Sequence, residues 1–302
     1  MATTVKAGAL ESELEQVIRP RRPMLRSLAA VVRQNPLGVI GFLIIMTLVI
    51  VAIFAPLIAP YDINDFRAGQ RTENPSWSHL FGTDNLGRDM FSRVVHGARI
   101  SLFVGFASVG LGTVIATAIG IISGYLGGVV DSVIQRTVDT AIAFPILLLL
   151  LILSLVLGPS MQTVIIAVGI AIIAPVTRIV RGAVLSERNN QYVEAARALG
   201  ASTPRILFVH IAPNIVALAI IIATTLLGTA ILAEASLSFL GLGIPVPNPS
   251  WGTDVNLARQ QFPIHIWWAF FPGAAITLTV LGFNLLGDSL RDIFDPRLRG
   301  RL

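Results

Sequence analysis

Residues 190–213 read NQYVEAARALGASTPRILFVHIAP and form a polar interruption in a chain that is otherwise mostly apolar. Asn190 is expected to cap a helix over 191–199, because an asparagine side chain can accept a hydrogen bond from a free amide of the first turn. Gly200 suits the end of that helix, since glycine adopts left-handed backbone angles without a Cβ clash. A second helix is predicted from Thr203, with Pro204 in its first turn. The stretch is therefore predicted to fold as a helix, a break and a second helix that continues into an apolar span.

The first of these helices has an unusual surface. Tyr192, Ala195, Ala196 and Leu199 fall at helical spacing on one side, and Glu194 places one carboxylate beside this apolar strip. Small side chains allow a partner to approach closely, so the helix suits a groove in another protein. The alternative interpretation is an alanine-rich helix that simply faces water.

Composition places the rest of the chain in a membrane. Only 13% of the 302 residues are charged and 54% are hydrophobic, with a mean hydropathy of +0.76. A soluble domain carries about 25% charged residues. The absence of cysteine excludes disulfides, zinc–thiolate sites and thiol nucleophiles. The net charge of +5 is compatible with nucleic-acid binding, but the basic residues border apolar segments, which indicates membrane topology and no nucleic-acid partner.

Uncharged stretches predict six transmembrane helices, at 37–59, between Arg99 and Asp131, and at 141–157, 161–177, 214–233 and 268–287. The first would be about 34 Å long, and its apolar run is too long for a signal peptide, so it is interpreted as an uncleaved span. The run 141–177 would be about 55 Å long as one helix, too long for one crossing, and Gly158-Pro159-Ser160 is a turn signal that divides it. The glycine-rich second span is expected to pack closely against other helices.

The predicted fold is an all-α integral membrane protein of six transmembrane helices with both termini in the cytoplasm. This orientation places most of the 22 lysines and arginines inside, as the positive-inside rule requires. The predicted divisions are a cytoplasmic tail (1–36), the first span (37–59), an extracytoplasmic loop (60–98), a five-helix core (99–290) with the helix 190–200 on its cytoplasmic side, and a second tail (291–302). Trp251, Trp267 and Trp268 are expected to form an interfacial belt.

No catalytic site or metal site is predicted. The four histidines lie in different loops or loop edges, and no His-Glu-x-x-His pair is present. The chain also lacks a glycine-rich phosphate loop followed by Lys-Ser/Thr, so any ATP hydrolysis must come from a partner.

The spacing of Glu194-Ala195-Ala196, Gly200 and Pro213 resembles the cytoplasmic coupling motif of ABC importer permeases. In that family the helix sits in a cleft of the ATP-binding subunit and transmits its closure to the membrane helices. The resemblance implies that the residues of ATPase coupling are Glu194, Ala195, Ala196, Leu199, Gly200 and Pro213.

Several other stretches resemble the permeases of dipeptide, oligopeptide and nickel importers. They are Asn35-Pro36-Leu37, FGTDNLGRD (81–89) with Ser92-Arg93, GARISL (97–102), EASLSFLGLG (234–243), PSWG (249–252) and DPRLR (295–299). The match is to the second, C-type permease of the pair, over about 35–302. It implies a type I ABC importer permease fold in a bacterial or archaeal cytoplasmic membrane.

The resemblance also implies partners and a substrate class. The partners are a second, homologous permease, two ATP-binding subunits and an extracytoplasmic substrate-binding protein, in contact with membrane lipid. The chain needs no cofactor of its own, because ATP and magnesium are bound by the ATPase subunits. Di- and oligopeptides are the first expectation for the substrate, with nickel chelates or oligosaccharides as alternatives.

Charged residues in the outer loop and at the end of the fifth span have further expected roles. Asp84, Arg88, Asp89 and Arg93 alternate in sign, and we expect them to hold the outer loop together as exposed ion pairs. Glu234, at the outer end of the fifth span, is expected to reach water and is a candidate outer gate.

Two rival functions come from other classes. An ion-coupled secondary carrier would need ionisable residues at mid-membrane, and the interiors of the predicted spans hold none. A membrane enzyme would need catalytic groups that the sequence lacks.

Overall fold

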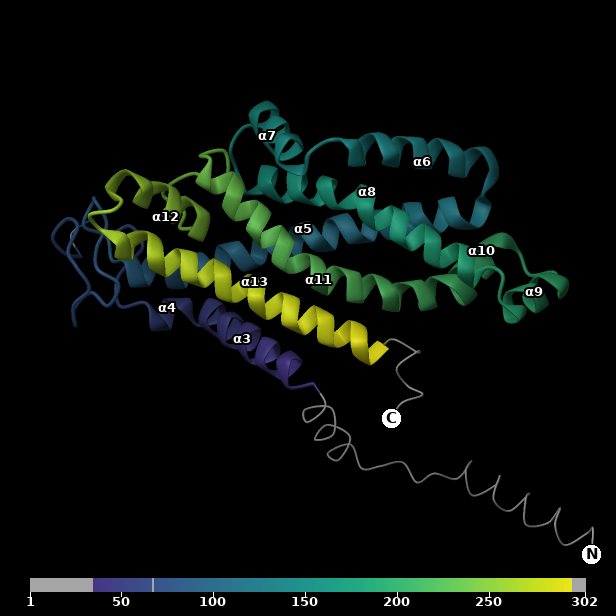
Figure 1. Ribbon diagram of the computed structural model, residues 1–302, viewed down its shortest axis with the longest axis horizontal. Coiled ribbons are helices and arrows are strands. Elements are labelled where there is room, and N and C mark those ends of the chain that lie inside the picture. Colours follow the sequence, from purple (N-terminus) through teal and green to yellow (C-terminus); the bar gives the residue numbers. More distant parts are fainter. Residues whose placement is uncertain (1–34, 67, 295–302) are drawn as a thin grey trace, which may run out of the picture.

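The computed structural model describes residues 35–66 and 68–294, and the regular elements of this part of the chain are helices joined by loops (Figure 1). Five helical stretches in it are long and apolar enough to cross a membrane. They are α3 (Pro36–Ile53), α5 (Met90–Leu126), α8 (Met161–Glu187), a continuous run that ends with α11 (Ala212–Phe239), and α13 (Ile266–Phe294). The all-α membrane fold is confirmed. Most of the predicted N-terminal tail, residues 295–302 and Arg67 lie outside the described residues.

The third predicted span, at 141–157, falls on a bent pair of helices. Helix α6 (Gly128–Ala143) and helix α7 (Ile146–Leu157) meet at 92°. Pro145 lies at the bend, where it has no amide hydrogen to continue α6, and Phe144 before it is extended, as proline favours. The prediction of one straight helix over 141–157 was therefore wrong. The predicted turn at Gly158-Pro159-Ser160 is confirmed, because α7 ends before Gly158 and the Ser160 side chain caps α8.

Helices α5 and α8 form the centre of the bundle, and glycines of α5 allow their close approach. A Cβ atom added at Gly112 would lie 2.6 Å from the carbonyl oxygen of Gly169, and one at Gly124 would lie 2.9 Å from that of Arg181. Both oxygens belong to the backbone of α8, so any side chain larger than hydrogen would push the helices apart. The predicted close packing of the glycine-rich span is confirmed.

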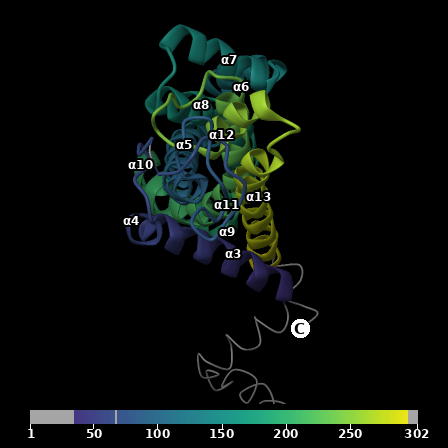
Figure 2. The ribbon, with the colours of Figure 1, turned by 90° about the vertical axis from the view of Figure 1, so that its left-hand side faces the viewer.

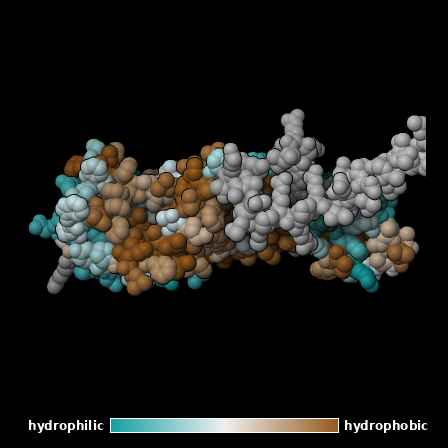
Figure 3. Space-filling model, turned by 90° about the horizontal axis from the view of Figure 1, so that it is seen from below, coloured by the Kyte–Doolittle hydropathy of each residue, from teal (hydrophilic) through white to brown (hydrophobic). Residues whose placement is uncertain are grey.

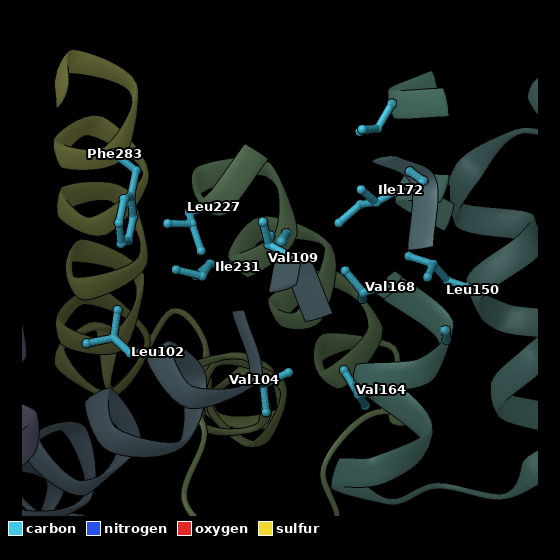
Figure 4. Close-up of a cluster of buried hydrophobic side chains, with 14 of the residues drawn as sticks. Leu102, Val104, Val109, Leu150, Val164, Val168, Ile172, Leu227, Ile231 and Phe283 are labelled. Carbon is cyan, nitrogen blue, oxygen red and sulfur yellow. The ribbon is translucent and has the colours of Figure 1, made fainter. Parts of the chain in front are cut away.

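Apolar side chains from several helices fill the space around this pair. Figure 4 shows Val109 of α5 and Val168 of α8 beside Ile231 and Leu227 of α11, with Phe283 of α13 on the far side. These residues belong to one buried cluster that runs through the bundle. On the outer edges, α3 lies against α13, and α6 and α7 lie on the opposite side of the molecule (Figure 2).

The surface between the two ends of the bundle is strongly apolar. Figure 3 shows hydrophobic side chains gathered between hydrophilic ends on the face seen from below. Leu57, Val114 and Leu155 are among the large hydrophobic residues that are mostly exposed. A hydrocarbon surrounding removes the cost of this exposure, and the helices satisfy their own backbone hydrogen bonds, as lipid requires.

The outer loop ends earlier than predicted. Helix α5 begins at Met90 and not near Arg99, because the Asp89 side chain caps it by accepting a hydrogen bond from the Ser92 amide at 2.8 Å. The last helix also runs to Phe294, past the predicted boundary at 290.

The expected tryptophan belt was wrong for two of its three members. Trp251 is 1% exposed and donates its indole hydrogen to the Val94 carbonyl oxygen at 2.9 Å, and Trp268 is also buried. Trp267 alone of the three is substantially exposed. Trp251 begins the short helix α12 (Trp251–Ala258) and packs over Gly97, where an added Cβ would lie 3.0 Å from its ring. Trp251 therefore holds α12 against α5 through this hydrogen bond and this ring contact.

We expect Gly41→Ala to destabilise the protein, although alanine favours helix more than glycine does. An added Cβ would lie 2.7 Å from the carbonyl oxygen of Gly282 and 2.8 Å from the amide nitrogen of Leu286, both in the backbone of α13. Such overpacking costs about 1–3 kcal/mol, more than the gain of about 1 kcal/mol in helix propensity. Thermal unfolding in detergent measures the effect. Gly273→Ala is the control, since nothing lies within 4 Å of its added Cβ; equal effects of the two changes would contradict the assigned contact.

Candidate coupling site

Helix α9 (Gln191–Ala198) lies at one end of the molecule, beyond the long helices that it joins (Figure 1). It follows α8 and is connected through α10 (Thr203–Arg205) and a π-helix, η1 (Ile206–Ile211), to α11. The predicted order of helix, break and helix is confirmed. This end of the bundle is opposite the end that holds α12 and the loop before α5.

The end of α9 is built around Gly200, as its sequence position predicts. Gly200 has a φ of +78°, in the left-handed region that favours glycine. The amide of Ala201 donates to the carbonyl of Ala196 and that of Gly200 donates to Arg197, each at 3.0 Å. This is the Schellman pattern, which satisfies the last carbonyls of a helix and turns the chain away.

The start of α9 differs from the prediction. The Asn190 backbone carbonyl accepts hydrogen bonds from the amides of Val193 and Glu194, but its side chain makes no cap. Its amide group donates instead to Glu187 Oε2 at 3.0 Å. The predicted side-chain cap was therefore wrong, because the side chain is turned toward Glu187, whose carboxylate accepts its amide hydrogen, and its oxygen does not reach the amides of the first turn.

The candidate coupling residues are turned away from the rest of the chain. Val193 is 0% exposed and is the residue that α9 buries against its own bundle. Glu194 and Ala195 are exposed, Ala196 is half-buried and Leu199 is 89% exposed. A leucine left in this state has no packing role within the chain. The exposed side of α9 is therefore a small apolar surface with one carboxylate beside it.

Pro213 lies at the junction between η1 and α11. It occupies the first turn of α11 and is exposed. Proline has no amide hydrogen, so the helical hydrogen-bond ladder cannot run unbroken through this point. The preceding turn is a π-turn, in which the Ala212 amide bonds to the Leu207 carbonyl five residues earlier. The structure thus places Pro213 close to the coupling helix in chain order but outside its exposed surface.

Glu234 does not reach water, contrary to expectation. It is 0% exposed, and its Oε1 accepts a hydrogen bond from Ser238 Oγ at 2.9 Å. The hydroxyls of Ser101 and Ser250 also face it, from α5 and from the residue that caps α12. A carboxyl group enclosed in this way lies at the joint of three segments and not on an open surface. The sequence could not show this, because the burial comes from α12 folding back onto α11.

The charged residues of the outer end are buried, not exposed as expected. Arg88 donates from Nε to Asp84 Oδ2 at 2.5 Å, and the Asp84 carboxylate also accepts the amides of Leu86 and Arg88. Asp89 caps α5 and contacts His79 Nδ1 at 3.0 Å. The expectation that these residues hold the outer loop together is confirmed.

Arg93 pairs with a residue that the sequence analysis missed. Its Nε and Nη2 contact Asp254 Oδ1 of α12 at 2.9 and 2.5 Å, and both side chains are 0% exposed. The two residues are 161 positions apart, so no local spacing could have found the pair. It joins α12 to the start of α5.

The polar residues of α11 serve its own backbone. The Thr224 hydroxyl donates to the Ile220 carbonyl, and those of Thr225 and Thr229 bond to carbonyls three or four residues earlier. Gly228 faces α13, where an added Cβ would meet Asn284 and the Val280 carbonyl. These contacts favour a role in helix packing over a role in lining a substrate path.

Two open cavities lie on the apolar flanks of the bundle. One, of about 500 Å³, is lined by α5 and by the stretch from η1 into α11, including Thr113, Thr117, Phe208 and Ala219. The other, of about 410 Å³, lies between α6, α5 and α8. Neither contains a charged side chain, and no cluster of His, Asp or Glu suited to a metal ion occurs among residues 35–66 and 68–294.

An all-helical bundle with a strongly apolar flank defines a multi-span membrane protein, and the eight-residue helix α9 protrudes from one of its ends. Residues 116–300 match the family described as binding-protein-dependent transport system inner membrane component. The chain belongs to this family. Residues 27–75 also match the N-terminal TM domain of oligopeptide transport permease C. The chain is therefore an ABC importer permease of the bacterial inner membrane, and it works with an ATPase and a binding protein.

Similar proteins span nearly the same length. The chain is 42% identical to the dipeptide transport system permease protein DppC of Alkalihalophilus pseudofirmus over 88% of both chains. It is 40% identical to the oligopeptide transport system permease protein OppC of Bacillus subtilis, over 97% of this chain and 96% of the relative. It is 45% identical to the glutathione transport system permease protein GsiD of Escherichia coli, over 89% of both. The resemblance to C-type peptide importer permeases is confirmed.

We expect Asp254→Ala to destabilise the protein by about 3–5 kcal/mol, because it leaves the Arg93 guanidinium buried without its counter-charge. Unfolding of the purified protein in detergent measures the loss. The double variant Arg93→Met/Asp254→Leu should regain most of it, since no charge remains buried. Asp139→Ala is the control: its pair with Arg178 is about half exposed, and such pairs contribute about 1 kcal/mol or less. A loss no larger than that of the control would contradict a structural role for the buried pair.

Proposed function

We propose that this permease imports di- or oligopeptides and that α9 is its point of engagement with the ATPase. The observation that carries the second part is the exposed face of α9 at the end of the bundle. Glu194 and Leu199 are turned outward there, while Val193 fixes the helix to the bundle. Glu194 would anchor the helix in a cleft of the ATPase, Ala195 and Ala196 would allow close approach, and Gly200 would turn the chain back.

The orientation follows from the distribution of charge. Arg178, Arg181, Arg188, Arg197 and Arg205 all lie in or beside α8, α9 and α10. The positive-inside rule then places this end, with both termini, in the cytoplasm, where ATP is available. The outer loop before α5 and helix α12 would face outward. We keep the division into tails, outer loop and core as part of this proposal, with the core starting at Met90 and its last helix ending at Phe294.

The subunit arrangement extends this orientation. A second, homologous permease would complete the translocation path as a heterodimer, two ATP-binding subunits would dock on the cytoplasmic side, and the binding protein would deliver substrate from outside. Lipid would cover the remaining apolar flanks, and no nucleic acid takes part. The open apolar cavity between α5 and α11 supports a helical or lipid neighbour on that flank.

The mechanism needs movement at α9 to reach the membrane helices. ATP-driven closure of the ATPase pair would move α9, and α9 is attached directly to α8 and, through η1, to α11. These helices pack in the bundle core, so they would rock together between inward- and outward-open states. No hydrolytic group of this chain is needed.

The substrate class rests on the relatives. The similar proteins are named for dipeptide, oligopeptide and glutathione transport, which are all peptide substrates. Nickel chelates and oligosaccharides remain the alternative cargoes for the same architecture.

We expect Glu194→Arg to lower uptake of a radiolabelled dipeptide by about tenfold or more, since it reverses the charge presented to the ATPase. The variant should still reach the membrane, because Glu194 is exposed and makes no contact that stabilises the bundle. Asn189→Ala, in the exposed turn before α9, is the control. Uptake that is unchanged by Glu194→Arg would contradict the proposed role of this residue in engaging the ATPase.

Glu234→Gln should leave uptake within about twofold of the unchanged protein. The amide keeps an oxygen that can accept the Ser238 hydroxyl and has nearly the shape of the carboxyl group. Dipeptide uptake in membrane vesicles is the measurement. A loss of uptake with an intact, assembled complex would restore Glu234 as an outer-gate residue.

A further inference from the structure

A cluster of hydrogen-bonded groups joins the coupling helix to both membrane helices beside it. We call it the Glu187 cluster, and it consists of the side chains of Glu187, Asn190, Tyr192 and Asn214 with the main-chain carbonyl of His210. Glu187 is the last residue of α8, Tyr192 lies in α9, His210 lies in η1 and Asn214 lies in α11. Four elements therefore meet at one carboxylate and one carbonyl.

The Glu187 carboxylate accepts hydrogen bonds from three donors. Tyr192 Oη and Asn214 Nδ2 both donate to Oε1, the latter at 2.8 Å, and Asn190 Nδ2 donates to Oε2 at 3.0 Å. Hydrogen bonds to an ionised acceptor are stronger than those between neutral groups. One side chain of α8 thus holds a residue before α9, a residue within it and a residue of α11.

The His210 carbonyl closes the cluster from the other side. It accepts a hydrogen bond from Asn214 Nδ2 at 3.1 Å and lies 3.4 Å from Tyr192 Oη, whose single hydrogen is donated to Glu187. Asn214 Nδ2 also lies 3.0 Å from Tyr192 Oη. Burial and the neighbouring Glu187 carboxylate raise the pKa of the Tyr192 phenol, so it keeps its proton as a donor at neutral pH. Tyr192 is the member of the cluster that α9 itself contributes.

The apolar contacts of α9 are too few to fix it alone. The helix has eight residues and buries only Val193 fully, while Ala196 is half-buried and the others are exposed. Burial of one valine stabilises by about 1.5–3 kcal/mol and does not define how the helix is turned about it. Hydrogen bonds have directions, so Tyr192 provides the second point of attachment that prevents rotation about Val193.

The side-chain hydrogen bonds of the Glu187 cluster also connect α9 to α11, where a π-turn interrupts the α-helical backbone. Helix η1 is a wider turn than an α-helix and is followed by Pro213, so the backbone between α9 and α11 lacks a continuous α-helical ladder. The Asn214 side chain bridges the gap by donating to the His210 carbonyl and to Glu187, and Tyr192 donates to the same Glu187 carboxylate. Movement of α9 is thereby passed to α11 through the cluster as well as through the main chain.

We propose that Tyr192, acting with Glu187 and Asn214, is a positioning residue that transmits the movement of the coupling helix to α8 and α11. This inference rests on the proposed role of α9 in ATPase engagement. Tyr192 does not supply the ATPase contact, because its hydroxyl is directed toward Glu187, Asn214 and the His210 carbonyl of its own chain. The ATPase contact belongs to Glu194 and Leu199 on the exposed face.

The test uses the full complex, with the second permease and the ATPase subunits, in proteoliposomes. Tyr192→Phe removes the hydroxyl and keeps the ring, so folding, assembly and ATP hydrolysis without the binding protein should be unchanged. Stimulation of phosphate release by the binding protein should fall about three- to tenfold, the loss expected for one or two hydrogen bonds in the transmitting state. Asn214→Leu, which removes the Nδ2 donor that α11 directs at the same Glu187 carboxylate, should have an effect of similar size.

Tyr125→Phe is the matched control, since it removes a phenol at the same end of the bundle that makes no hydrogen bond within residues 68–294. Normal stimulation in both Tyr192→Phe and Asn214→Leu would overturn the inference. So would a loss that is matched by loss of ATPase subunits from the complex, because that would make Tyr192 part of the docking contact. If Glu194→Arg also had no effect, the proposed engagement of α9 would fall with it, whereas an effect of Glu194→Arg alone would leave that engagement in place.

Discussion

The close approach of α5 and α8 is the contact on which the rest of the structure depends. In a membrane, apolar side chains gain little by leaving lipid for another helix, so association depends on dense packing between surfaces that fit. Gly112 and Gly124 supply that fit by letting the backbone of α8 approach to distances that no Cβ atom allows. Because α8 leads directly into α9, the same contact determines how rigidly the coupling helix is held relative to the core.

Polar groups are concentrated at the two ends of this packed centre and serve different purposes there. At the outer end, the Arg93–Asp254 pair is fully buried, and removing either charge would leave the other without a partner. Such an arrangement holds α12 in one place. At the end that holds α9, Glu187 is partly buried while Asn190, Tyr192 and Asn214 are exposed, so their hydrogen bonds can break and re-form in water at modest cost. The protein thus has one fixed end and one adjustable end, and in the proposed orientation the adjustable end is the cytoplasmic one.

Much of the architecture was predictable because lipid imposes simple rules on sequence. Long uncharged stretches gave the membrane helices, Gly158 and Pro159 gave the turn between α7 and α8, and Gly200 gave the end of α9. Three wrong predictions, for Trp251, Glu234 and Arg93, have a common cause. Each residue was expected to be exposed from its position along the chain, but each is buried where α12 packs against α5 and α11, and local composition does not predict that packing. The bend at Phe144-Pro145 was missed because the uncharged run on both sides of it is continuous.

The sequence by itself determined that this chain is a multi-span membrane protein with a short helix between its fourth and fifth long apolar segments, because hydrophobic length and glycine placement act locally. Through the resemblance to the coupling motif, it also predicts that Glu194, Ala195 and Leu199 face another protein, and the structure leaves all three exposed. Only the tertiary structure decided how that surface is attached. Asn214 lies 27 residues after Glu187 and 22 after Tyr192, beyond a π-turn, so its hydrogen bonds to them depend on three helices meeting at one point in space.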